Sequence, residues 1–121
     1  MKIEQTTLSN GLRIVTSRMP AARSVAVSMI VGVGSRYEDF GTNGGVSHFL
    51  EHLLFKGSEH WPSTQVIGEA IDEVGGQHNA YTSNDLTNYY IKVPKRHAKL
   101  AYSILADMMR HPILDETEVD R

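Results

Sequence analysis

The amino-acid sequence predicts an α+β fold, with a mixed but mostly antiparallel sheet and helices packed on one face. Two observations support this. Short β-type segments come in pairs joined by turn residues, and segments with helical spacing of apolar residues lie between and after these pairs. The chain has 121 residues, enough for one hydrophobic core and not for two. We therefore expect residues 1–121 to form a single domain, or part of a larger one.

The first third of the chain is predicted to be β structure. Residues 6–16 form two short strands joined at Asn10-Gly11, a dipeptide that strongly favours a tight hairpin turn. Residues 24–34 are rich in apolar and β-branched side chains, and we expect them to form a central strand buried on both faces. Their last part, Gly32-Val33-Gly34, is not a dinucleotide-binding loop, because Tyr37 stands where a third glycine belongs.

Helices are predicted in the rest of the chain. The first lies between Asn43, its expected N-cap, and Gly57, its expected stop. The second runs from residue 62 to 74, with a solvated acidic face. The third runs from Pro94 to about Arg110, and a further start follows at residues 115–118. Only one more turn precedes Arg121, so we expect the chain to end inside this last element.

A second hairpin is predicted between the second and third helices. Its strands are residues 77–82 and 87–93, and turn-forming residues 83–85 join them. The first of these strands is short, polar and preceded by two glycines, which is typical of an exposed edge strand. Such an edge can accept a peptide as one more strand, or it can bind nothing, and the pattern alone favours neither.

Composition and charge exclude several classes of function. The net charge is −2 and 21% of residues are charged, so neither a nucleic-acid nor a membrane partner is expected. Cysteine is absent, so any zinc must be held by histidine and carboxylate groups. The sequence has no apolar segment of about 20 residues and no signal-peptide pattern. A cytoplasmic location is the default expectation, with a removed presequence left open.

The first predicted helix carries three chemically reactive side chains in an otherwise apolar run. His48 and His52 are one turn apart, and Glu51 lies beside them on the same face. Burial of an unpartnered charge is costly, so this stripe must face an ion or a water-filled cavity. The alternative is an amphipathic helix whose polar residues are only solvated, but the flanking residues are too apolar for that.

The order His-x-x-Glu-His is the inverted form of the zincin helix. Two histidines at this spacing can bind one zinc ion, with each nitrogen at about 2.0–2.1 Å from the metal. The glutamate between them is close enough to take a proton from water. The motif therefore predicts a Zn²⁺ site formed by His48 and His52, with Glu51 beside the activated water.

Four blocks of the sequence resemble the pitrilysin/insulinase family of zinc peptidases, which includes the mitochondrial processing peptidase and its bacterial relatives. The blocks span residues 8–13, 34–38, 45–57 and 75–82. The resemblance implies a metalloenzyme domain of the processing-peptidase type. It also implies that His48 and His52 are zinc ligands, that Glu51 is the catalytic base, and that Asn79, Ala80 and Tyr81 on the edge strand bind the main chain of a peptide substrate.

The resemblance further implies parts that residues 1–121 do not contain. In the family, a third zinc ligand is a glutamate on the helix that begins here at Asp115, and it would fall just past Arg121. Members also enclose the substrate with a second, similar half or subunit, a homodimer being one arrangement. We therefore expect this chain to be the N-terminal part of a zinc-binding peptidase domain, and to be inactive without the third ligand.

The expected function is zinc-dependent endopeptidase activity on peptides or presequence-like segments, through a zinc-activated water with Glu51 as base. Two alternatives stay open. One is a non-catalytic scaffold or partner subunit of the same fold, although such a subunit has no need for His48, Glu51 and His52 on an apolar helix. The other is a metal-binding module without hydrolysis.

Overall fold

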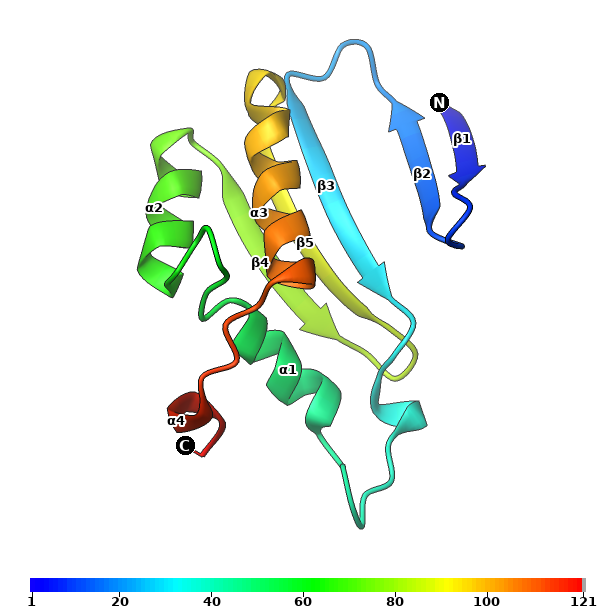
Figure 1. Cartoon of the computed structure of the whole chain (residues 1–121). Helices are drawn as coiled ribbons and strands as arrows, with labels where there is room; N and C mark the ends of the chain where they lie inside the picture. The colour runs from blue at the N-terminus through cyan, green and yellow to red at the C-terminus, as the bar shows by residue number, and fades with distance from the viewer. Residues whose placement is uncertain (121) are drawn as a thin grey trace.

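The structure, a computed structural model, describes residues 1–120 and has the expected α+β fold (Figure 1). Its strands are β1 (Lys2–Thr7), β2 (Arg13–Arg18), β3 (Ser24–Val31), β4 (Gln77–Thr82) and β5 (Thr87–Pro94). Its helices are α1 (Val46–Leu54), α2 (Thr64–Glu73), α3 (Ala98–Arg110) and α4 (Glu116–Val119), with 3₁₀ turns η1 (Ser35–Tyr37) and η2 (Lys95–His97). Within residues 1–120, no helix combines the length and the apolar character needed to cross a bilayer.

The strands form two antiparallel sheets. Strands β1 and β2 pair as the hairpin predicted at Asn10-Gly11, where the backbone N–H of Leu12 donates to the Asn10 side chain at 3.0 Å. Strands β3, β5 and β4 form a three-stranded sheet in that order, with both pairs antiparallel. The predicted second hairpin is thus confirmed, and β4 is an edge strand as expected.

The prediction that residues 24–34 form a central strand buried on both faces is wrong. Strand β3 lies at an edge of its sheet, and β5 occupies the centre. Side chains of β3 alternate between half-buried ones, such as Val27, and exposed ones, such as Ile30, which is 66% exposed. Because Ile30 on the outer face is apolar, the alternation in β3 resembles a continuous apolar run. Such a run is also the pattern of a strand buried on both faces, so the sequence did not distinguish the two.

The hydrophobic core lies between one face of the three-stranded sheet and the helices. Figure 1 shows α1, α2 and α3 on that same face, as the sequence predicted. Every helix of this group contributes to the core, and β5 supplies the centre of the sheet surface. The buried residues of the core are Leu54, Ile67, Ile71, Tyr89, Ile91, Val93, Ala101, Ile104, Leu105 and Met108.

A buried aspartate on α3 holds the loop that follows α1. Asp107 accepts hydrogen bonds from the backbone N–H and from the Nδ1 atom of His60, both at 2.9 Å. Burial alone would raise the pKa of Asp107, but contacts with the Ser58 hydroxyl and with His60 outweigh it and lower that pKa to about 2. The same carboxylate raises the pKa of His60. The loop after α1 is therefore anchored to α3 by polar contacts.

Replacement of Asp107 by Asn is expected to lower the free energy of unfolding by about 1–3 kcal/mol near pH 6, because a charged acceptor of several hydrogen bonds is lost. The pKa of Asp107 is depressed, so its stabilisation is present above the usual pKa of 3.8 and disappears as the pH falls towards 2. Urea unfolding at pH 6 and pH 3 measures the difference. Glu69→Gln, on the exposed face of α2, is the control. An Asp107→Asn effect of equal size at both pH values would contradict this account.

Candidate metal centre

Helix α1 brings the two predicted zinc ligands together. The Nε2 atoms of His48 and His52 lie 3.0 Å apart, with ring centroids separated by 4.7 Å and planes inclined by 55°. Two nitrogens bound tetrahedrally to one zinc ion at about 2.0–2.1 Å are separated by roughly 3.3 Å. The observed spacing is close to that value, and both rings are open to solvent. The pair therefore fits one zinc ion with little side-chain movement.

Glu51 lies beside this pair and is nearly buried. A carboxylate oxygen of Glu51 and one ring nitrogen of each histidine lie within 4.8 Å of one another. Glu51 is 8% exposed, and its Oε2 accepts a hydrogen bond from the hydroxyl of Thr82. The pKa of the neighbouring core tyrosine, Tyr89, is raised to about 12 by its burial and secondarily by the negative charge of Glu51. The carboxylate thus borders the core on one side and the histidine pair on the other.

Small cavities border Glu51, as the motif predicted. One of about 510 Å³ includes His48 and Glu51 in its lining, and another of about 180 Å³ includes Glu51 and His52. A larger cavity, of about 1290 Å³, lies elsewhere, between β2 and β3. No group of metal-ligating side chains from the described residues lines it. The chemistry of the side chains therefore places the candidate site at α1 rather than in this larger cavity.

Helix α1 is only partly buried. Ser47, Glu51, Leu53 and Leu54 are buried, whereas Phe49 is 40% exposed. Val46 and Leu50 are also exposed on the outer side of the helix. An apolar sequence all round a helix does not show whether other elements cover both sides, and in residues 1–120 only one side of α1 is covered.

The predicted N-cap of α1 is wrong. Gly45, not Asn43, occupies that position, with a positive φ of 87° that favours glycine. The Asn43 side chain instead accepts a hydrogen bond from the backbone N–H of Asp39, four residues earlier, at 2.6 Å. Asn43 is a turn residue here, a role for which asparagine is equally suited.

A residue that the motif did not reveal satisfies the start of α1. Glu38 accepts the backbone N–H groups of Gly45 at 2.6 Å and Ser47 at 2.8 Å. A hydrogen bond from the Ser47 side chain, followed by these two backbone bonds, lowers the pKa of Glu38. A carboxylate at this end also interacts favourably with the helix dipole. The only sequence signal for Glu38 was its place in the block at residues 34–38, where no role was assigned.

Strand β4 places the predicted substrate-binding residues next to Glu51. Ala80 lines both cavities at Glu51, Tyr81 lines the larger and Asn79 the smaller. Asn79 and Tyr81 are exposed on the face of β4 that is turned away from α1. The backbone N–H of Ala80 donates to the Asn79 side chain at 2.8 Å. The structure thus brings the edge strand and the His-x-x-Glu-His motif together, although the role of Asn79, Ala80 and Tyr81 stays a prediction.

Comparison with known proteins agrees with this geometry. A family model described as insulinase, peptidase family M16, matches residues 13–121. An uncharacterized zinc protease of Bacillus subtilis is 46% identical over 98% of this chain and 29% of its own length. A probable mitochondrial-processing peptidase subunit beta of Arabidopsis thaliana is 39% identical over 96% of this chain and 22% of its own length.

A solved structure gives the same result. The crystal structure of a protease from Helicobacter pylori superposes with a TM-score of 0.89 and 33% identity, covering 97% of this chain and 28% of that protein. The chain thus spans less than a third of the length of the relatives that it matches. The family model covers most of the chain, and the expected resemblance is confirmed. The chain therefore belongs to the insulinase family of peptidases, peptidase family M16.

Proposed function

We propose that this chain is the metal-binding part of a zinc-dependent endopeptidase, with His48 and His52 as zinc ligands and Glu51 as the general base. The observation that carries the proposal is the convergence of one atom from each of these three residues within 4.8 Å. Relatives named zinc proteases support it, as does the spacing of the two imidazole nitrogens.

Zinc, when bound, would act as a Lewis acid towards the scissile carbonyl and lower the pKa of a coordinated water to about 7. Glu51 would take one proton from a water molecule as the oxygen of that water attacks the carbonyl carbon. When the carbon–nitrogen bond breaks, Glu51 passes this proton to the leaving amine. The overall reaction consumes one water and leaves a new carboxyl and a new amino terminus.

The substrate proposed is a peptide, or a presequence-like segment, in extended conformation. Strand β4 is an edge strand, and edge strands bind peptides through main-chain hydrogen bonds. Asn79, Ala80 and Tyr81 are the proposed binding residues. The Ala80 N–H now donates to a side chain of its own strand, and a substrate carbonyl would replace that acceptor. The processing-peptidase name of the Arabidopsis relative favours presequence-like substrates.

The active unit is proposed to contain more than these residues. Catalytic zinc commonly has three protein ligands, and within residues 1–120 only Glu51 joins the two histidines. We infer a third ligand downstream of residue 120. Helix α4 lies near the segment that follows α1, since Lys56 Nζ is 3.6 Å from Glu118 Oε2 (Figure 1). A second homologous half or subunit, such as a homodimer partner, would close the substrate chamber.

The general-base role of Glu51 is tested by Glu51→Gln in a form of the protein at the length of its relatives. We expect peptide cleavage to fall by about 10²–10⁴-fold, because the amide cannot accept the proton. Zinc content should stay unchanged, since both histidines remain. The measurements are fluorogenic peptide hydrolysis and elemental analysis, with Glu69→Gln on α2 as the control.

Unchanged cleavage in Glu51→Gln would refute the base assignment. Absence of cleavage from the unaltered, zinc-loaded protein would instead favour the non-catalytic scaffold or partner subunit. Zinc binding with no hydrolysis in any form would favour a metal-binding module.

A second test compares residues 1–121 with the longer form. We expect the short chain to bind zinc weakly and to show little or no cleavage, because two histidines leave the ion under-coordinated. Isothermal titration with zinc and peptide hydrolysis measure the two properties. His52→Ala should weaken binding further in both forms. Equal peptidase activity in the short and long forms would contradict the inferred third ligand.

A further inference from the structure

We propose that Thr82 is a positioning residue for Glu51: its hydroxyl holds carboxylate oxygen Oε2 and so leaves Oε1 to receive the proton. This inference rests on the proposed function, because it concerns the same base. It adds a residue outside the motif, on a different element of the fold.

The contact joins the end of β4 to the middle of α1. Alternate residues of β4, namely His78, Ala80 and Thr82, are half-buried on the face towards α1. The Thr82 hydroxyl donates to Glu51 Oε2. Among the described residues, Thr82 is the one hydrogen-bond donor to the Glu51 carboxylate. A nearly buried carboxylate with a single donor takes its orientation from that donor.

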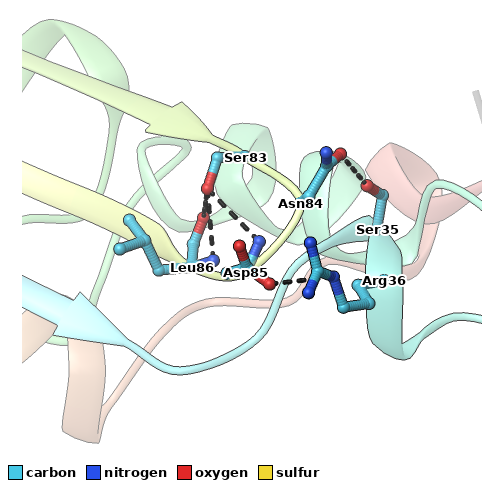
Figure 2. Close-up of polar contacts among 6 residues, drawn as sticks. All are labelled: Ser35, Arg36, Ser83, Asn84, Asp85 and Leu86. Atoms are coloured by element: carbon cyan, nitrogen blue, oxygen red, sulfur yellow. Dashed lines mark hydrogen bonds and ion pairs between the residues drawn. The ribbon is translucent and has the colours of Figure 1, made fainter.

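Polar contacts set the position of Thr82. The turn at residues 83–86, which directly follows Thr82, is held by Gly34 and by η1 (Figure 2). The backbone N–H groups of Ser35 and Arg36 donate to the carbonyls of Ser83 and Asn84, at 3.2 and 2.9 Å.

Side chains of η1 and of this turn add further contacts. Ser35 Oγ donates to Asn84 Oδ1 at 2.8 Å, and Arg36 Nε lies 3.0 Å from Asp85 Oδ1. Figure 2 shows both contacts. The backbone of Gly34 also packs closely against the turn, since a Cβ atom at Gly34 would lie 2.2 Å from the Ser83 carbonyl oxygen. The turn after Thr82 is thus held by backbone contacts as well as by side chains.

The same short segment also holds the helix that carries Glu51. Two residues after Arg36, Glu38 accepts the N–H groups of Gly45 and Ser47 at the start of α1. Residues 34–38 therefore connect the turn after Thr82 with the first turn of α1. The spacing between Thr82 and Glu51 is fixed from both sides, as expected for a contact that orients a reacting group.

The test uses Thr82→Val and Thr82→Ser in the zinc-loaded protein at the length of its relatives. Valine keeps the shape and removes the hydroxyl, so kcat for peptide cleavage should fall about 10- to 100-fold with little change in KM or in zinc content. Serine keeps a hydroxyl and should restore most of the activity. Thr87→Val is the matched control, because Thr87 lies opposite Thr82 and its hydroxyl donates to Val33 O at 2.9 Å, away from Glu51.

A second readout does not depend on activity. Crystal structures of the metal-free variants should show the Glu51 carboxylate rotated or in two orientations in Thr82→Val, and unchanged in Thr82→Ser and Thr87→Val. An unchanged carboxylate or an unchanged kcat in Thr82→Val would overturn the proposal, as would Thr82→Ser being as slow as Thr82→Val. If Glu51→Gln is fully active, the proposed function fails, while the carboxylate orientation still decides whether Thr82 positions Glu51.

Discussion

The structure depends on one constraint, the accommodation of a nearly buried carboxylate on α1. Glu51 is 8% exposed, and an uncompensated charge at such a position would cost several kcal/mol. The Thr82 hydroxyl donates to this carboxylate, two cavities border it, and two histidines that could bind a cation lie beside it. Each of these requires α1 to keep a fixed position against β4. The arrangement of the surrounding elements follows from that requirement.

Polar contacts hold α1 at both ends, because hydrophobic packing covers only part of it. Phe49 and neighbouring apolar side chains are exposed on its outer side, so the core alone would allow the helix to shift. Glu38 satisfies the N–H groups at its start. The loop beyond its end is joined to α3 through His60 and Asp107. Hydrogen bonds are directional, and they can fix the rotation of a helix more tightly than apolar contacts can.

The sequence predicted the parts of the site that lie on one element. His48, Glu51 and His52 share a face because of helical periodicity alone, and the hairpin at Asn10-Gly11 follows from local turn chemistry. Thr82 was not predicted, because its partner lies 31 residues away and only the fold brings them together. The misplaced N-cap has a similar origin, since asparagine suits turns and helix starts equally. Contacts between distant elements leave no periodic signal in a single sequence.

The Thr82 contact also bears on which role the carboxylate can take. A carboxylate that ligates a metal and one that accepts a proton compete for the same oxygens. With Oε2 engaged by a hydroxyl donor, Glu51 keeps one oxygen, and two histidine nitrogens stand ready for the ion on the solvent side. A hydroxyl donor makes Oε2 a poorer ligand, because its lone pair is shared with a proton. The Thr82 contact therefore leaves one Glu51 oxygen without a protein donor, and under the proposed function that oxygen is the one that would receive the proton.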